Sequence, residues 1–145
     1  MRALLQRVSQ AKVSVDQQTI ASIDQGVVVL LGVSKEDNRE NARWLAGKLA
    51  GLRIFEDDVG KLNLSLSEVD GSVLVVSQFT LYGNARKGRR PSFTAAAPAE
   101  IAKPLVDFFA EELRLRGLKV ATGEFGAHML VEIHNDGPVT LLLEK

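Results

Sequence analysis

Short apolar runs separated by polar residues dominate the pattern along this chain of 145 residues. The runs at residues 27–33 and 73–77 are rich in Val and nearly all apolar, which predicts strands covered on both faces. Further short segments have the composition of strands. These are residues 2–9, 12–16, 19–24, 53–56, 118–122, 128–134 and 139–143.

The pattern changes to helical spacing after residue 36. Asp37 and Glu40 are spaced as a capping box, with Asp37 as the cap and Glu40 reaching back to it. Apolar residues then follow on one face of a predicted amphipathic helix. These are Ala42, Leu45, Leu49 and Leu52, and the helix is expected to end near Gly51.

A second helix is predicted after Pro98, a residue that suits a first helical turn. Its apolar stripe comprises Ile101, Leu105, Phe108, Phe109 and Leu113. Gly117 follows as a natural C-terminal cap. Pro104 either kinks this helix early or marks its true start.

The order of these elements predicts the fold class. Many strands and two good helices are too few helices for βαβ units throughout. We therefore predict an α/β fold, as a single layered domain over residues 1–145, with mixed, largely antiparallel β-sheets and two main helices.

Composition narrows the chemistry. The chain has no Cys, which excludes disulfides, thiolate metal sites and a Cys nucleophile. Its formal net charge of zero argues against a broad electrostatic grip on nucleic acid. No apolar run approaches a membrane span, and the first residues lack the apolar core of a signal peptide. A cytoplasmic location is therefore expected, with no metal and no cofactor.

The richest candidate site follows the apolar run at 73–77. Ser77, Gln78, Phe79 and Thr80 come at the strand end, where a rigid element meets solvent. Successive backbone N–H groups there could stabilise an oxyanion. The Thr80 hydroxyl could instead act as a nucleophile, although no base lies near it in sequence. The residue types leave both possibilities open.

A basic cluster comes soon afterwards. Arg86, Lys87, Arg89 and Arg90 follow directly on the polar strand end. Such clusters are usually solvated loops, but the position beside the candidate site favours contact with phosphate.

Two further features are unusual. Gly137–Pro138 enters an apolar strand, although Pro cannot donate to a sheet ladder. Arg7 lies on the same strand face as Ala3 and Leu5, so it is either a rim arginine or a positioned donor inside a site. The two histidines, His128 and His134, are too far apart for a close metal pair and are expected to be packed or rim residues.

The stretches SQFTLYG at residues 77–83 and NDGPVT at 135–140 together resemble the D-aminoacyl-tRNA deacylases. The likeness covers the whole chain, including residues 1–8 and the basic segment 87–93. The resemblance implies a cytoplasmic homodimer that hydrolyses the ester between a D-amino acid and the terminal adenosine of tRNA. It also implies clearance of glycine from mischarged tRNA.

The resemblance assigns roles to the candidate residues. Residues 77–80 would line the pocket, with N–H groups near Phe79 and Thr80 serving the oxyanion. Thr80 would be the nucleophile in one view, and the 2′-hydroxyl of the RNA would do the chemistry in another. Gly137–Pro138 would be cis and reach into the partner's pocket, with Arg7 fixing the pair. Phe125 and Met129 are expected near the pocket.

Rigid backbone at the pocket mouth would read handedness by exclusion. A D-residue points its Cβ outward, whereas an L-residue pushes it into the Gly-Pro wall. Glycine has no Cβ and would not be excluded.

Two other functions remain open from sequence. One is an RNA-binding module without catalysis, based on the four basic residues at 86–90. The other is a generic hydrolase that uses Ser77 or Thr80 with one of the two histidines.

Overall fold

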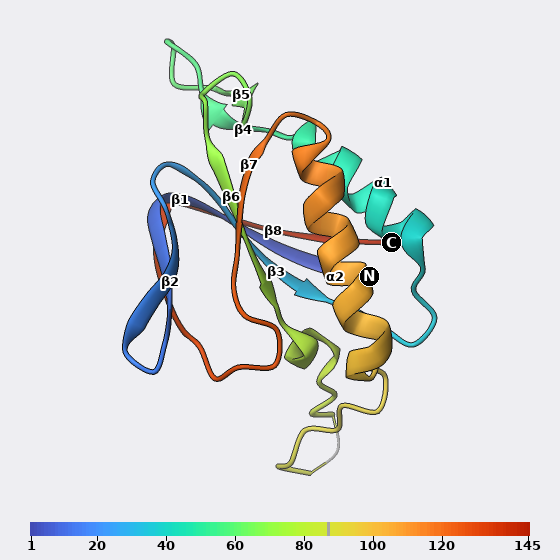
Figure 1. The fold of residues 1–145 in the computed structure, drawn as a ribbon. Coiled ribbons are helices and arrows are strands. Elements are labelled where there is room, and N and C mark those ends of the chain that lie inside the picture. The colour runs from blue at the N-terminus through green and yellow to red at the C-terminus, as the bar shows by residue number, and fades with distance from the viewer. Residues whose placement is uncertain (87) are drawn as a thin grey trace.

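The structure is a computed structural model and describes residues 1–86 and 88–145. Figure 1 shows a twisted sheet with two helices side by side on one face. The strands are β1 (Arg2–Val15), β2 (Gln18–Ile23), β3 (Gly26–Gly32), β4 (Arg53–Glu56), β5 (Leu62–Ser65), β6 (Ser72–Ser77), β7 (Lys119–Thr122) and β8 (Leu130–Glu144). The helices are α1 (Arg39–Ala50), α2 (Ala99–Arg114) and a short 3₁₀ helix, η1 (Phe79–Tyr82).

Six strands form the main sheet in the order β2-β1-β3-β6-β7, with β8 paired to β1. β1 runs antiparallel to β2, β3 and β8, whereas β3, β6 and β7 run parallel to one another. A separate antiparallel hairpin joins β4 and β5. The predicted fold class, a mixed and largely antiparallel α/β fold with two main helices, is confirmed.

The all-apolar runs form the centre of the sheet because each of its faces is covered. Val73 and Val75 of β6 lie on the face that the helices cover, in one apolar cluster with Leu45 of α1 and Phe109 of α2. Leu74 on the same strand belongs to a second apolar cluster on the other face. Continuous hydrophobicity, rather than alternation, is the pattern that such two-sided burial requires.

Two long strands replace four predicted short ones. Residues 2–9 and 12–16 belong to the single strand β1, and residues 128–134 and 139–143 largely belong to β8. β8 continues through the Gly137–Pro138 peptide, which is cis. The polar residues between the predicted strands lie within these longer strands, and the β1–β8 ladder shifts register there, between Gln6 and Gln10 of β1. The strand β5 was not predicted.

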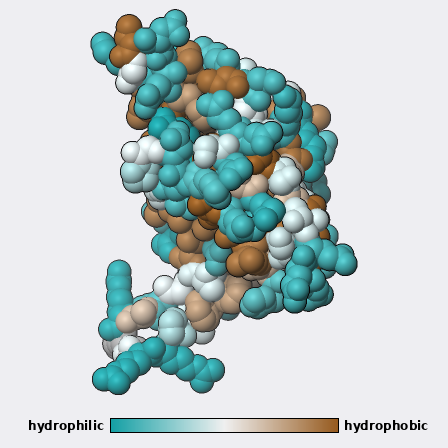
Figure 2. All heavy atoms as spheres, turned by 90° about the vertical axis from the view of Figure 1, so that its left-hand side faces the viewer, coloured by the Kyte–Doolittle hydropathy of each residue, from teal (hydrophilic) through white to brown (hydrophobic). Residues whose placement is uncertain are grey.

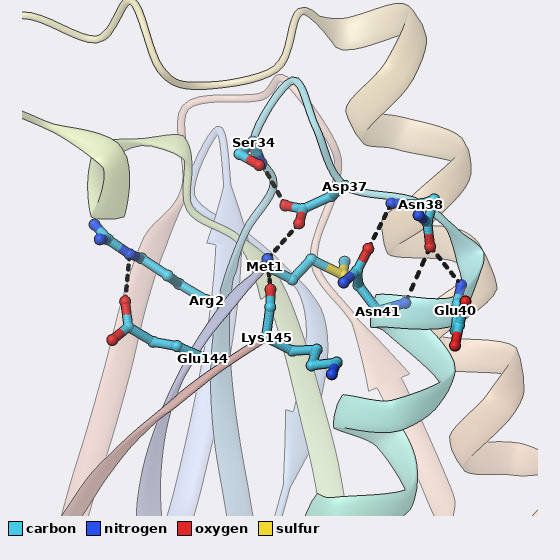
Figure 3. Close-up of polar contacts among 9 residues, drawn as sticks. All are labelled: Met1, Arg2, Ser34, Asp37, Asn38, Glu40, Asn41, Glu144 and Lys145. Atoms are coloured by element: carbon cyan, nitrogen blue, oxygen red, sulfur yellow. Dashed lines mark hydrogen bonds and ion pairs between the residues drawn. The ribbon is translucent and has the colours of Figure 1, made fainter.

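The start of α1 differs from its prediction by one residue. Asn38, not Asp37, is the N-cap, and its side chain accepts from the N–H groups of Glu40 and Asn41 at 2.9 and 3.3 Å. Asn41, not Glu40, completes the capping box. Asp37 instead accepts from the Ser34 N–H and from the Met1 amino group, as Figure 3 shows. A tertiary contact has thus taken the residue that local sequence favoured as cap.

The helix α2 begins at Ala99, as predicted, with Pro98 as its N-cap rather than in its first turn, and Pro104 lies inside the helix instead of marking its start. At its end the Gly117 N–H bonds to the Arg114 carbonyl and the Leu118 N–H bonds to the Leu113 carbonyl. This pair of bonds, with Gly117 at φ +82°, is the Schellman arrangement expected of a terminal glycine. Among the helices of the described residues, none is long and apolar enough to cross a membrane.

Candidate active site

A cavity of about 410 Å³ opens where the parallel strands end. β3 and β6 contribute Leu31, Val76 and Ser77, and the chain continues into the wall as Gln78 and Phe79. The helix α2 and the segment before it close the opposite side with small residues. The loop after β7 and the start of β8 supply the remaining wall, which comprises Phe125, Gly126, Ala127, His128, Met129 and Val131. The cavity is mostly apolar with a few polar groups at one edge, as small-molecule sites commonly are.

The parallel ladder fixes the polar edge of this cavity. Leu31 and Ser77 are partners in the register of β3 and β6, and the Gln78 N–H then donates to the Leu31 carbonyl at 2.8 Å. After this bond the chain turns into η1. On the other side of β6 the Gly123 N–H donates to the Val75 carbonyl at 2.9 Å, which holds the start of the loop that carries Phe125 and Met129.

The helix η1 presents unpaired backbone donors. The first N–H groups of a helix lack partners within it, and in η1 these belong to Phe79 and Thr80. Neither group donates to a backbone carbonyl within the part of the chain described. Two adjacent free N–H groups beside an apolar cavity can stabilise a developing oxyanion.

Thr80 has surroundings unlike those of an activated nucleophile. Its hydroxyl oxygen accepts a hydrogen bond from the side-chain amide of Gln78. An amide N–H donor cannot remove the hydroxyl proton, whereas an activated threonine needs a base within reach. Thr80 is exposed beside the cavity.

The histidines lie in different places. His128 is an exposed residue on the cavity wall, and His134 contacts the Gln10 amide on the sheet surface, with 3.1 Å between Gln10 Nε2 and His134 Nδ1. Among the described residues neither imidazole forms a hydrogen bond with Ser77 or Thr80. The geometry therefore gives no support to a hydrolase built on a hydroxyl–imidazole pair.

A second group of predicted residues gathers around Arg7, which is only 5% exposed. Its guanidinium donates to the carbonyls of Ile54 at 2.8 Å and Asp136 at 3.3 Å. It also pairs with the carboxylates of Asp136 and Glu56. Gly137 lies against it so closely that an added Cβ would be 2.7 Å from Arg7 Nη2. Arg7 is thus a buried donor packed against the Gly137–Pro138 segment, which is itself exposed.

The basic segment lies in a projecting loop after η1. The loop is closed by paired backbone bonds between Asn84 and Ser92, at 2.8 and 2.9 Å. Arg86, Arg89 and Arg90 are exposed there, and Lys87 lies outside the described residues. The loop extends below the body of the molecule in Figure 1, and Figure 2 shows hydrophilic residues at its lower end.

The predicted residues therefore form three groups. Ser77, Gln78, Phe79, Phe125 and Met129 line one cavity, with Thr80 beside it. Arg7, Gly137 and Pro138 lie together at another place on the same chain. The exposed arginines form the third group.

Sequence reasoning missed the small residues of the cavity wall, Ala97, Ala99 and Ala102. Their only signal is small size at the start of α2, which is equally typical of close packing.

Comparison with known proteins gives a consistent result. The family described as D-Tyr-tRNA(Tyr) deacylase matches residues 4–144. A D-aminoacyl-tRNA deacylase from Thermomicrobium roseum is 62% identical over all of this chain and 94% of its own length. One from Thermotoga petrophila is 58% identical over all of this chain and 97% of its own. The solved structure titled "c-Myc DNA Unwinding Element Binding Protein" has a TM-score of 0.93 at 42% identity, covering 100% of this chain and 99% of that one.

The fold, the cavity and these matches define the class: the chain is a hydrolase that acts on an ester bond. It belongs to the D-Tyr-tRNA(Tyr) deacylase family, whose curated relatives are named D-aminoacyl-tRNA deacylases.

Proposed function

We propose that this protein hydrolyses the ester bond of D-aminoacyl-tRNA, releases free tRNA and the D-amino acid, and spares L-aminoacyl-tRNA. The observation that carries the proposal is the pair of free N–H groups on Phe79 and Thr80 at the edge of an apolar cavity. Hydrolysis of an aminoacyl ester passes through a tetrahedral oxyanion, and such donors stabilise that charge.

The chemical step needs little from side chains. Water adds to the ester carbonyl carbon, the bond to the ribose oxygen breaks, and that oxygen takes a proton. Because the Thr80 hydroxyl contacts the Gln78 amide rather than a base, we assign the oxyanion to the N–H groups of Phe79 and Thr80. The 2′-hydroxyl of the terminal adenosine would help to position the water, and the protein would hold the ester in place.

The Gly137–Pro138 segment would supply the chiral wall from a second copy of the chain. Along β8, Gly137 lies six positions beyond Val131, the last residue of this strand that lines the cavity. At about 3.3 Å per residue this is roughly 20 Å of strand, so the segment does not reach the cavity of its own chain. Exposed Leu130, Leu141 and Leu142 on β8 support burial of this surface against a partner.

Handedness would be read by exclusion at this wall. Gly137 and Pro138 have little flexible side chain, and buried Arg7 braces the segment from behind. The Cβ of an L-residue would meet the wall, whereas that of a D-residue would point away from it. Glycyl-tRNA would be cleaved as well, because glycine offers no Cβ to exclude.

The acceptor end of tRNA would lie along the projecting loop. Arg86, Arg89 and Arg90 are exposed on the side that follows η1, and with Lys87 they would contact phosphates. A local patch of this kind suits a neutral protein that grips RNA only near its end. A cytoplasmic location, where aminoacyl-tRNA is used, belongs to the same proposal.

Matched D-tyrosyl-, L-tyrosyl- and glycyl-tRNA test the activity. We expect rapid loss of the D-ester and the glycyl ester and little loss of the L-ester. Equal cleavage of the D- and L-esters would refute the chiral wall. Salt-sensitive tRNA binding without cleavage of any ester would identify an RNA-binding module instead.

A mixing experiment tests the shared site. Gly137→Ala alters the wall and should slow cleavage of the D-ester, and Ala99→Trp blocks the cavity and should abolish it. Co-expressed chains should reach at least about a quarter of the wild-type activity, more than either variant alone contributes to the mixture, because half of random dimers would contain one intact site out of two. No recovery, with dimers demonstrated, would contradict the cross-subunit arrangement.

A further inference from the structure

The helix η1 lies at the surface, and its orientation must be fixed by specific contacts. All four of its residues are exposed or only partly buried, and Phe79 is 57% exposed. Its Phe79 and Thr80 N–H groups nevertheless need a fixed direction to serve as oxyanion donors. Core packing therefore does not by itself explain how η1 is held.

Arg2, at the start of β1, reaches the far end of η1. Its Nη1 atom donates to the Leu81 carbonyl at 2.8 Å, and its guanidinium carbon lies 4.7 Å from the centre of the Tyr82 ring. Its Nε atom pairs with the Glu144 carboxylate at 2.7 Å. Figure 3 shows Arg2 beside Glu144, close to the short helical turn drawn in pale green.

The opposite residue in the ladder makes this approach possible. Arg2 pairs with Gly32 of β3, and directly paired residues share one face of a sheet. A Cβ on Gly32 would be 3.1 Å from the Leu81 Cβ and 3.3 Å from Tyr82 Cδ2. The missing side chain lets η1 settle on the sheet at the point where Arg2 can hold it.

We propose that Arg2 is a positioning residue for deacylation: it anchors the Leu81–Tyr82 end of η1 and thereby fixes the aim of the Phe79 and Thr80 N–H groups. The inference rests on the proposed function, because it assigns those donors to the oxyanion. Arginine suits the role because one planar group donates to a carbonyl, stacks on a ring and pairs with a carboxylate. A lysine would keep the charge but not the planar contact.

The kinetic test compares Arg2→Met with Lys12→Met. Lys12 is on the same strand and also forms an exposed ion pair, with Glu132, so its variant controls for the lost charge. We expect Arg2→Met to lower the single-turnover rate at saturating enzyme about 10-fold or more, because misplaced catalytic groups lose rate steeply. The enzyme concentration that gives half of the maximal rate should change little, and Lys12→Met should behave as wild type. Arg2→Lys should fall between them, and it carries the comparison if Arg2→Met does not fold.

A second measurement does not depend on activity. Amide hydrogen exchange at Leu81 and Gly83, whose N–H groups donate to the Gln78 and Thr80 carbonyls, should accelerate in Arg2→Met and not in Lys12→Met, while exchange in β3 and β6 stays unchanged. Unchanged exchange and rate in Arg2→Met would overturn the proposal, as would an equal loss of rate in Lys12→Met. A wild-type protein that cleaves no ester would refute the proposed function, yet the exchange comparison would still decide whether Arg2 holds η1.

Discussion

β1 supplies one arginine to each of two regions, and the two arginines are held very differently. Arg7 is 5% exposed and bonds to two carbonyls behind the Gly137–Pro138 segment. The Arg2 side chain is 39% exposed and bonds to one carbonyl of η1. Arg7 therefore lies inside the fold and braces an exposed segment from behind, whereas Arg2 contacts a surface turn whose Phe79 ring also packs edge-on against Phe93. Loss of Arg7 should therefore lower the free energy of unfolding. Loss of Arg2 should mainly change the orientation of η1.

The largest effect is expected for Arg7→Met. The substitution leaves the Ile54 carbonyl buried without its donor and releases Gly137 from its brace. We expect the free energy of unfolding to fall by about 2–4 kcal/mol and deacylation to be lost. Denaturant unfolding measures the first effect. The control Lys12→Met removes an exposed pair on the same strand and should cost less than about 1 kcal/mol. Equal losses in Arg7→Met and Lys12→Met would contradict the structural role of the buried Arg7.

Gly137→Ala should have the next largest effect. Its new Cβ would lie 2.7 Å from Arg7 Nη2 and 3.0 Å from Val139 Cγ2, at φ +111°. We expect a loss of about 1–3 kcal/mol in stability together with a lower rate on the D-ester. Gly60→Ala controls for backbone strain alone, because Gly60 has φ +75° with open space around it. An unchanged rate and an unchanged D/L preference in Gly137→Ala would count against the wall.

The double substitution Arg89→Ala/Arg90→Ala tests the loop beyond η1. Removing two phosphate contacts should weaken tRNA binding and lower the slope of log affinity against log salt by about 1.4–1.8. Binding titrations at several salt concentrations measure that slope. Lys103→Ala, an exposed cation on α2, should leave it unchanged. An unaltered slope in the double variant would place the RNA elsewhere.

Thr80→Ala should cost much less activity than Gly137→Ala. The change removes the hydroxyl that accepts from Gln78 but keeps the N–H group at position 80. We expect a loss of about 5-fold, the value of one ordinary hydrogen bond. Single-turnover hydrolysis of the D-ester provides the measurement. A loss of about 10⁴-fold with the fold intact would instead identify Thr80 as the nucleophile.

The smallest effect concerns Tyr82, the only tyrosine in the chain. Burial raises the pKa of its phenol, the negative charge of Asp37 adds to this, and the Arg2 guanidinium opposes it. A raised pKa means that the contribution of Tyr82 to stability is complete below about pH 10 and is lost as pH rises through the folded-state value. Because Arg2→Met removes the positive charge that opposes this rise, phenolate absorbance should show a still higher pKa of Tyr82 in that variant. A lower pKa in that variant would contradict the contact between Arg2 and the ring.

Much of the fold could be predicted because hydrophobic patterning carries it. β3 and β6 were recognisable from continuous apolar runs, and both helices from their stripes. The joined strands β1 and β8 were not recognisable, because exposed polar residues on a long ladder look like interruptions. The cap of α1 was misplaced by one residue because Asp37 and Asn38 suit the position equally, and only the contacts of Asp37 with Met1 and Ser34 separate them.

The candidate site was predictable in part. The strand end at Ser77–Gln78 follows from where the apolar run stops, and the cavity there was not visible in the sequence. Phe125 and Met129 were expected from the family resemblance, and both line that cavity. The hold of Arg2 on η1 joins residues 79 positions apart, and no local pattern encodes such a contact.

The length of β8 has a consequence for how the protein would behave in a cell. If the strand keeps Gly137–Pro138 roughly 20 Å from the cavity residue Val131, an isolated chain would bind an ester without reading its handedness. Stereochemical discrimination would then belong to the assembled pair and would fade on dilution below the dissociation constant. Proofreading fidelity would thus depend on how abundant the protein is.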